Sequence, residues 1–470
     1  MAYPRISLVL AAACFCGLAN PLHAQEPTLA QATRSQDAVP NANVVNIHST
    51  FGKDASTQIF VSWRTPVAGS TAQQEKNSDS DVEYGVTNAY GSTTSAATFE
   101  SGGGLQHHAE LSGLTPGTTY HYRVRSGEAV GPDCTFRTGL PADTQKTFTF
   151  AVMGDVEGPA DGNKFFPGIT DWIAERDVDF FVVLGDLAYF GQQQSGWNGF
   201  FTSGAPLFQS CVFVPVLGDH SMERLIPAPA DVEEKKRYHG TDVIAREMPT
   251  LYLEQFMVPD NDTKSSYDDY GRRSLRGLWY SFDYGSAHIV SVENTQELTP
   301  IVMREATDAQ QPVWVAKDLE NTKAPWRFVL SHRAYYPYES EETQWEHVNN
   351  RRSTHRAQWD EIFADGRVSL TMGAHVGGWI LSHPIINGKV SEEGQNGTVH
   401  MKLGKIGDYA QSPGAWEVEQ WGTVLPTDPD EKIHSGLVLI TVSPDGAKVE
   451  TWDWSKETLS HSFSLTPQKP

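Results

Sequence analysis

The sequence predicts two domains, a small β-sandwich followed by a larger α/β domain. Between residues 44 and 138, short alternating stretches such as TQIFVSWRT and TYHYRVRSG are separated by turn residues, as is typical of antiparallel sandwiches. Between residues 148 and 470, short apolar runs rich in Val and Phe indicate strands that are buried on both faces. Three of these runs end in Gly-Asp at a spacing of roughly 30 residues, which leaves room for a crossover helix between parallel strands.

The N-terminal residues predict a secreted, extracellular protein. Residues 1–24 combine Arg5 with an apolar core and end in Leu-His-Ala, which is typical of a cleavable signal peptide. An uncleaved membrane anchor is the weaker interpretation, because the apolar stretch is short and polar residues follow it. Residues 25–43 are polar and aperiodic and predict a flexible leader, and no later apolar run has the length of a membrane span.

The charge balance limits the classes of partner. The chain carries 36 basic and 58 acidic residues, a formal net charge of −22 at pH 7. This surplus disfavours nucleic acids and anionic membranes as partners. It also repels a phosphate ester, so that attraction of such a substrate would have to come from bound metal ions.

Several polar residues are expected to be structural or modified. Cys134 and Cys211 follow the signal segment and are favoured as buried thiols, although a secreted chain leaves a disulfide between them open. His107 and His108 are expected to be structural, as strand histidines near a domain boundary often are. The sequences that begin at Asn261 and Asn396 have the form of glycosylation acceptors, which only a eukaryotic secretory route would use.

Several elements of the second domain can be placed along the chain. Residues 139–147 form the linker, and the mixed apolar and charged segment GITDWIAERDVD predicts a crossover helix before the second Gly-Asp strand. Residues 221–278 form a long charged insertion, which is either a lid or substrate-selecting segment, or a solvated surface excursion. Residues 435–454 predict a closing hairpin with an Asp-Gly turn.

Acidic residues stand at the ends of the three Gly-Asp strands, at Asp155, Asp186 and Asp219. Because open α/β sheets place their ligand sites at the carboxyl edge, these carboxylates are expected to converge on one rim, where a multivalent cation would offset their repulsion. Two further apolar runs end in His332 and His375. Each Gly-Asp alone could be ordinary turn chemistry, but carboxylates combined with strand-end imidazoles predict a metal site.

Five ordered blocks resemble the purple acid phosphatases, which are binuclear metallophosphoesterases. The family's blocks read DxG, GDxxY, GNH followed by an acid, VxxH and GHxH, and the chain has GDVEG, GDLAY, GDHS, VLSH and AHVGG in this order. LSGLTPGTTYHYRV resembles the fibronectin type III-like domain that precedes the catalytic domain in plant-type members. The resemblance implies a fibronectin type III-like β-sandwich at 44–138 and a metallophosphoesterase (calcineurin-like) domain at 148–470, with two packed mixed sheets flanked by helices.

The resemblance also implies a binuclear metal centre. The residues that carry over from the family's motifs as metal ligands are Asp155, Asp186, Tyr189, Asp219, His332 and His375. The first three would hold a ferric ion. Asp186 would bridge it to a divalent ion (Zn, Mn or Fe), which the last three would hold.

Three departures from the blocks affect this centre. Gly377 stands where the family has the second histidine of GHxH, so that the ferric site is weakened unless water or His383 fills the gap. Asp219 replaces the asparagine of GNH and adds a negative charge, which makes a bound water harder to deprotonate. Ser221 replaces the acid after GNH, and GDVEG has one residue more before the glycine of DxG.

The implied function is that of a secreted acid phosphatase that hydrolyses small phosphate monoesters. His220 is the candidate general acid and, with Arg333, a candidate substrate-binding residue, while a purely structural role is the alternative for His220. Two other functions stay open. One is a non-catalytic member that binds metal or phosphate, and the other is a nucleotide or phosphodiester hydrolase, which only the 221–278 insertion favours. A homodimer is compatible with the family.

Overall fold

The structure is a computed structural model. It describes residues 44–66, 80–142, 144–156, 164–228, 233, 242–261, 276–295, 301–336, 357–375, 378–392, 396–406, 421–425 and 436–468. The expected signal peptide and leader lie outside the described residues, as do Gly377 and parts of the 221–278 insertion. Within the described part of the chain, no helix combines the length and apolar character that a membrane crossing requires.

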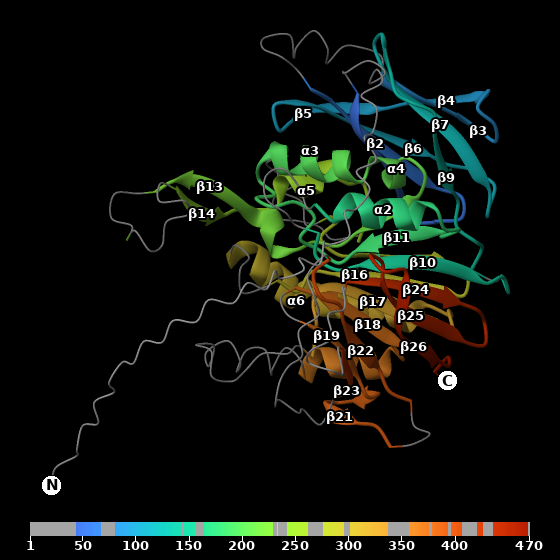
Figure 1. Ribbon diagram of the computed structural model, residues 1–470, viewed down its shortest axis with the longest axis vertical. Coiled ribbons are helices and arrows are strands. Elements are labelled where there is room, and N and C mark those ends of the chain that lie inside the picture. Colours follow the sequence, from blue (N-terminus) through green and yellow to red (C-terminus); the bar gives the residue numbers. More distant parts are fainter. Residues whose placement is uncertain are drawn as a thin grey trace, which may run out of the picture. The chain divides into compact units, whose positions relative to one another are not determined.

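The N-terminal part consists of β-strands in two sheets, as predicted (Figure 1). One of the sheets has the order β4-β3-β7-β8, with β9 also paired to β7. The other contains β1, β2, β6 and β5, and apolar side chains from both sheets meet in one core. The strands are β1 Val45–Phe51, β2 Ile59–Pro66, β3 Ser80–Gly85, β4 Ser92–Ser95, β5 Ala97–Ser101, β6 Gly104–Leu111, β7 Thr119–Ser126, β8 Ala129–Val130 and β9 Cys134–Arg137.

A ten-stranded sheet joins the two parts of the chain. Its order is β26-β25-β24-β10-β11-β12-β1-β2-β6-β5, and β1 pairs in parallel with β12 through Thr50 and Phe213. The strands β10, β11 and β12 are parallel neighbours, as the Gly-Asp repeats predicted. The additional strands are β10 Phe148–Met153, β11 Phe180–Val183, β12 Val212–Pro215, β24 Leu437–Val442, β25 Ala447–Asp453 and β26 Thr458–Leu465.

A seven-stranded mixed sheet carries the histidine blocks. Its order is β15-β16-β17-β18-β22-β19-β23, and the four strands from β16 to β22 in this order are parallel. The strands are β15 Tyr280–Tyr284, β16 Ala287–Val292, β17 Trp326–Arg333, β18 Leu370–Ala374, β22 Val399–Lys402, β19 Trp379–Ser382 and β23 Trp421–Leu425. Short hairpins are formed by β13 Glu223–Pro227 with β14 Asp242–Arg246 and by β20 Ile385–Ile386 with β21 Lys389–Val390.

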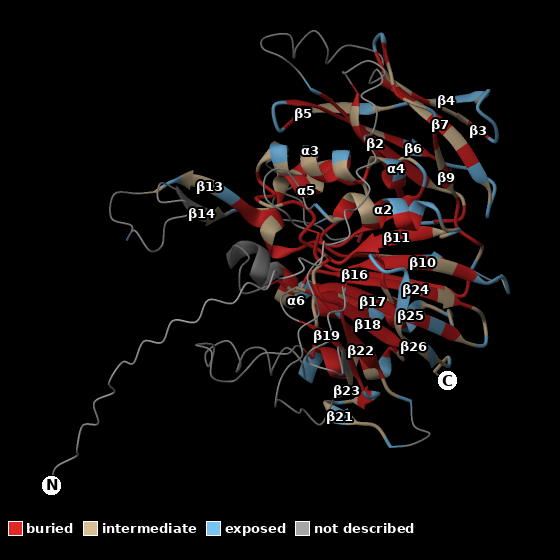
Figure 2. Ribbon diagram, in the orientation of Figure 1, coloured by how far each residue is buried: buried red, intermediate tan, exposed pale blue. Residues whose placement is uncertain are grey.

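The two large sheets pack face to face, and helices cover their outer faces (Figure 2). In β11, Phe180 and Val182 contribute to the core between the sheets, whereas Phe181 and Val183 contribute to the core under the helices. This strand is therefore buried on both faces, as its uninterrupted apolar run predicted. The helices are α2 Phe166–Ala174, α3 Gln194–Ser203, α4 Ala205–Phe208, α5 Thr250–Gln255, α6 Ile301–Asn321 and residues 357–365.

The structure tests several smaller predictions. Cys134 and Cys211 are both buried free thiols, and burial raises the pKa of Cys134 to about 12. Asn261 is 1% exposed, so that its predicted role as a glycosylation acceptor does not fit the folded chain, whereas Asn396 is exposed. Both ring nitrogens of His107 are bonded to threonine hydroxyls, which supports its structural role.

Candidate metal centre

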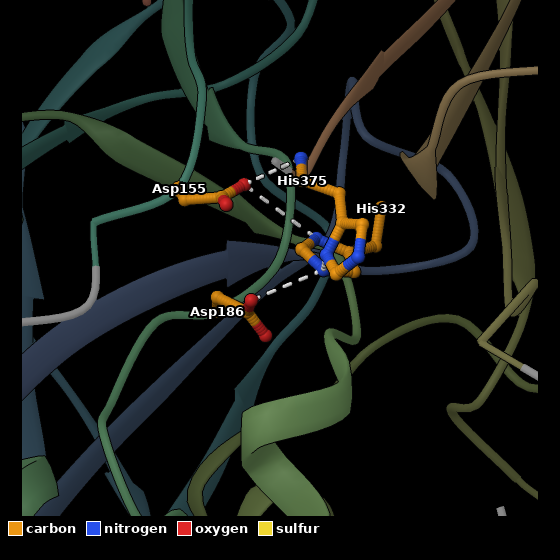
Figure 3. Close-up of side chains that lie close together, drawn as sticks. All are labelled: Asp155, Asp186, His332 and His375. Carbon is orange, nitrogen blue, oxygen red and sulfur yellow. Dashed lines mark hydrogen bonds and ion pairs between the residues drawn. The ribbon is translucent and has the colours of Figure 1, made fainter. Parts of the chain in front are cut away.

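The candidate centre lies where strands of the two large sheets end (Figure 3). Asp155 and Asp186 follow β10 and β11, and Asp219 begins the short 3-10 helix η2, Asp219–Met222, after β12. From the other sheet, His332 lies near the end of β17, and His375 directly follows β18. Because all five strands present their carboxyl ends at this edge, the predicted convergence of the side chains is realised.

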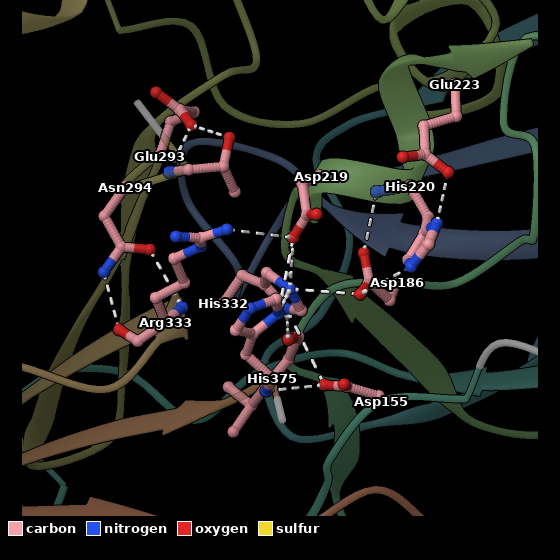
Figure 4. Close-up of polar contacts among 12 residues, drawn as sticks. Asp155, Asp186, Asp219, His220, Glu223, Glu293, Asn294, His332, Arg333 and His375 are labelled. Atoms are coloured by element: carbon pink, nitrogen blue, oxygen red, sulfur yellow. Dashed lines mark hydrogen bonds and ion pairs between the residues drawn. The ribbon is translucent and has the colours of Figure 1, made fainter. Parts of the chain in front are cut away.

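The ligand atoms lie close enough to share an ion. Asp155, Asp186, His332 and His375 each offer one such atom, and all four atoms lie within 4.8 Å of one another. The Nε2 atom of His332 lies 3.1 Å from Asp186 Oδ2 and 2.9 Å from Asp219 Oδ1. His375 Nδ1 lies 3.4 Å from the same Asp219 oxygen (Figure 4).

Backbone contacts orient the side chains of this cluster. His332 donates its Nδ1–H to the carbonyl of Leu184 at 2.8 Å, which leaves Nε2 directed at the carboxylates. Asp155 accepts the backbone N–H of His375 at 2.8 Å, and Asp186 accepts that of His220 at 3.0 Å. Each carboxylate is thus held by a residue from another strand end.

The glycines that precede the acids are required by close packing. Gly185 has φ +86, and a Cβ atom there would lie 2.4 Å from His332 Nδ1. A Cβ atom at Gly218 would lie 2.1 Å from the backbone nitrogen of Asp186. Asp186 (φ 46) and His375 (φ 67) themselves adopt left-handed backbone conformations, which are costly and concentrate at functional sites.

The electrostatics of the cluster favour a bound cation. Burial alone would lower the pKa of His332, but the carboxylates of Asp186 and Asp155 raise it well above its usual value. Burial and the positive charges of His332 and Arg333 lower the pKa of His375 to about 2. Three buried carboxylates with two imidazoles form a donor set that suits hard or borderline metal ions.

His220 lies beside the cluster with a carboxylate partner of its own. Its Nδ1 atom lies 2.5 Å from Glu223 Oε2, and its Nε2 atom lies 3.9 Å from Asp186 Oδ2. The ring of Tyr189 stacks on the His220 ring, with centroids 4.8 Å apart. A role of Tyr189 as an iron ligand stays a prediction.

Arg333 lies on the opposite side of Asp219 from His220 (Figure 4). Its Nη2 atom is 3.9 Å from Asp219 Oδ1. The Arg333 backbone is held by Asn294, which accepts its N–H at 2.9 Å and donates to its carbonyl at 2.6 Å. The positive charge of Arg333 is therefore close enough to interact with the carboxylate of Asp219.

His383 does not fill the gap left at Gly377. In β19, Ile380 pairs with Lys402 and Leu381 with Met401, so that the strand runs away from the edge that carries His375. His383 follows the last residue of β19, which places it on the order of 13 Å from this edge at the usual rise of a strand. The suggestion of a substitute imidazole at His383 was wrong, because strand direction could not be known from the sequence.

Sequence reasoning missed two residues of the site. Glu223 lies three residues after His220, and the η2 turn brings its carboxylate to the His220 ring. It therefore supplies an acid near the position where Ser221 replaces one. Asn294 follows β16 in the apolar segment HIVSVENT, where the position of an amide just after a buried strand was the available signal.

Comparisons with known proteins agree with this fold. Residues 44–138 match the profile described as "Purple acid Phosphatase, N-terminal domain", and residues 148–377 match "Calcineurin-like phosphoesterase". Purple acid phosphatase 22 of Arabidopsis thaliana is 24% identical over 387 residues, which are 78% of this chain and 76% of the relative. An uncharacterized protein of Mycobacterium tuberculosis is also 24% identical, over 73% of this chain, and the match spans less than two thirds (63%) of that relative.

The solved structure of purple acid phosphatase PPD1 from yellow lupin (Lupinus luteus) seeds has a similar fold. Its TM-score is 0.65 at 17% sequence identity, and the match covers 91% of this chain and 75% of that one. The two profile matches account for most of the chain and occur in the order that the sequence blocks predicted. The chain therefore combines an N-terminal domain of the purple acid phosphatase type with a calcineurin-like phosphoesterase domain.

Proposed function

We propose that the protein is a secreted acid phosphatase that hydrolyses small phosphate monoesters with a ferric and a divalent ion. The observation that carries the proposal is the convergence of three carboxylates and two imidazoles from five strand ends, in a chain that matches the calcineurin-like phosphoesterases. Asp155, Asp186 and Tyr189 would hold the ferric ion. Asp186, Asp219, His332 and His375 would hold the divalent ion.

When bound, such a metal pair supplies polarisation of the phosphoryl group and activation of a water molecule. The protein's own residues prepare the site for it. His332 presents Nε2, because Leu184 accepts its Nδ1–H. The backbone bonds to Asp155 and Asp186 fix the two carboxylates before any ion arrives, so that little reorganisation accompanies binding.

His220 is proposed as the general acid for the leaving oxygen. Glu223, a carboxylate acceptor that is 1% exposed, takes the hydrogen bond from Nδ1, and Nε2 therefore faces the proposed substrate side. Stacking against Tyr189 restricts the ring further. A general acid must lie within hydrogen-bond reach of its target, and this arrangement holds one ring nitrogen at the edge of the cluster.

The first test is metal content, by elemental analysis of undialysed secreted protein, with the visible spectrum and the hydrolysis of p-nitrophenyl phosphate near pH 5 measured on the same sample. Two metals per chain including iron, a tyrosinate band and turnover are expected. Asp186→Asn should lose all three. One divalent ion or none, in a colourless and inactive protein, would contradict the proposal and favour the non-catalytic function.

Substrate class is tested on the same preparation. Small monoesters should be hydrolysed faster than bis(p-nitrophenyl) phosphate and faster than nucleotides, at equal concentration. A reversed order would favour the phosphodiester or nucleotide hydrolase.

A further inference from the structure

A charged pair at the rim of the cluster is formed by Asp219 and Arg333. The Nη2 atom of Arg333 lies 3.9 Å from Asp219 Oδ1, and the side chains are 14% and 5% exposed. At this distance and degree of burial, charge interactions are much stronger than at the surface. The pair is therefore in a position to affect whatever binds at Asp219.

The position of Arg333 is built into the strand end. Asn294 bonds both its backbone N–H and its carbonyl, and the Ser331 hydroxyl donates to the same carbonyl at 2.9 Å. The buried carboxyl of Glu293 attracts the guanidinium, and this attraction counteracts part of the increase that burial causes in the pKa of Glu293. These contacts bring a permanent positive charge to Asp219.

The charge at Asp219 is unusual for its position in the block. The third family block has a neutral asparagine where this chain has Asp219, so that the cluster here holds three carboxylates, at Asp155, Asp186 and Asp219. A buried carboxylate without a compensating charge is costly, and it also strengthens the hold on a divalent ion. The positive charge of Arg333 lowers the cost of burying Asp219, and it also weakens the attraction of the site for a divalent ion.

We propose that Arg333 balances the charge of Asp219, so that the two residues act as a unit in place of the neutral asparagine. The inference rests on the proposed metal centre and assigns Arg333 a role in setting metal affinity, in addition to any contact with substrate. The pair keeps the negative charge at the divalent position near that of an asparagine site.

Single and charge-compensated double variants test the charge balance. Chelator-stripped wild type, Asp219→Asn, Arg333→Met and the double variant are titrated calorimetrically with Zn²⁺ alone and Mn²⁺ alone. Asp219→Asn should weaken binding and Arg333→Met should strengthen it, each by about tenfold, the low end of effects seen around metal ligands. The double variant should return to within about threefold of wild type, because its net charge is unchanged.

Controls separate the charge effect from misfolding. Arg333→Lys keeps the charge and should bind metal as wild type does, whereas Arg224→Met removes an exposed arginine that is paired with Glu247 and should change nothing. Thermal unfolding without metal should show Arg333→Met as the least stable variant, with partial recovery in the double variant.

The outcomes distinguish this inference from the proposed function. If the wild type binds metal but Arg333→Met leaves the affinity unchanged and only weakens binding of inorganic phosphate, Arg333 is a substrate contact and the charge-balance proposal is overturned. If the wild type binds neither ion, the metal centre itself is refuted, and the charge-balance proposal with it.

Discussion

The Nδ1 atom of His220 and the Oε2 atom of Glu223 lie 2.5 Å apart at the edge of the metal cluster. Glu223 is buried, and its backbone carbonyl accepts the N–H of Gln192 at 3.0 Å. The Glu223 backbone is therefore anchored beside the cluster, and the buried carboxylate orients the His220 ring through its contact with Nδ1.

Glu223→Gln should impair substrates with poor leaving groups selectively. The glutamine amide can either accept a hydrogen bond from Nδ1 or donate one to it, so that Nδ1 of His220 is no longer held as the donor and the imidazole is less well placed to give up a proton at Nε2. We expect kcat for an alkyl phosphate to fall by about 10²-fold, within the range of general acid catalysis, and kcat for p-nitrophenyl phosphate to fall much less. Glu247→Gln, an exposed control, should change neither rate. Equal losses for both substrates would contradict a role in proton donation.

Gly185→Ala should remove metal binding. The left-handed backbone alone costs an alanine on the order of 1–2 kcal/mol, and the new Cβ would in addition meet His332 Nδ1 at 2.4 Å. Gly91→Ala is the matched control, because Gly91 has φ +109 with nothing near its Cβ position. We expect both variants to lose thermal stability and only Gly185→Ala to lose Zn²⁺ binding by calorimetry. Retained binding in Gly185→Ala would show that His332 tolerates displacement.

The strand ends that carry the acids and histidines could be predicted, because buried parallel strands have a local signature and their carboxyl ends share an edge. The pairing of β1 with β12 could not, since Thr50 and Phe213 are far apart in sequence and nothing local marks their contact. The Glu223 contact depends on the η2 turn after Asp219, and turns of this kind have no strong pattern. The direction of β19, which excludes His383, is likewise set by tertiary pairing.

The stability of the protein should fall as the pH rises from about 6.5 to about 9. Burial would lower the pKa of His288, but bonds of 2.8 Å to Asp283 and Asp318 raise it to about 9. The folded state thus binds a proton that the unfolded state releases, and the stabilisation is complete below pH 6.5 and lost through pH 9. His288→Gln should abolish roughly 2 kcal/mol of this decline, measured by urea unfolding at pH 6.5 and 9.5. Parallel curves for the two proteins would contradict the assignment.

At acidic pH, two histidines at the contact between the N-terminal strands and α5 should make the protein less stable, because their pKa values are lowered instead of raised. The Nε2 atoms of His48 and His108 lie 3.1 Å from the carbonyls of Gln255 and Glu254, and burial lowers their pKa values to about 4 and about 3. Below pH 6.5 these histidines bind protons in the unfolded chain but stay neutral in the folded chain, so the stability of the protein should fall as the pH falls. His108→Gln should reduce this loss between pH 7 and 4.5 by about 2 kcal/mol. His121→Gln, at a partly buried histidine that lies 2.9 Å from Asp133, serves as control, and an unchanged slope in His108→Gln would argue against this account.

Gly377→His should strengthen the proposed ferric site. Position 377 aligns with the second histidine of the fifth block, and the structure leaves His383 too far from the edge to substitute for it. A restored imidazole should raise iron content and turnover together, by about 10–100-fold where the wild type is limited by occupancy. Gly378→His places the same side chain one residue further and should give no gain. If Gly377→His changes neither iron content nor the visible band, the site is complete without that ligand, and the departure at Gly377 reflects a different iron environment in this chain.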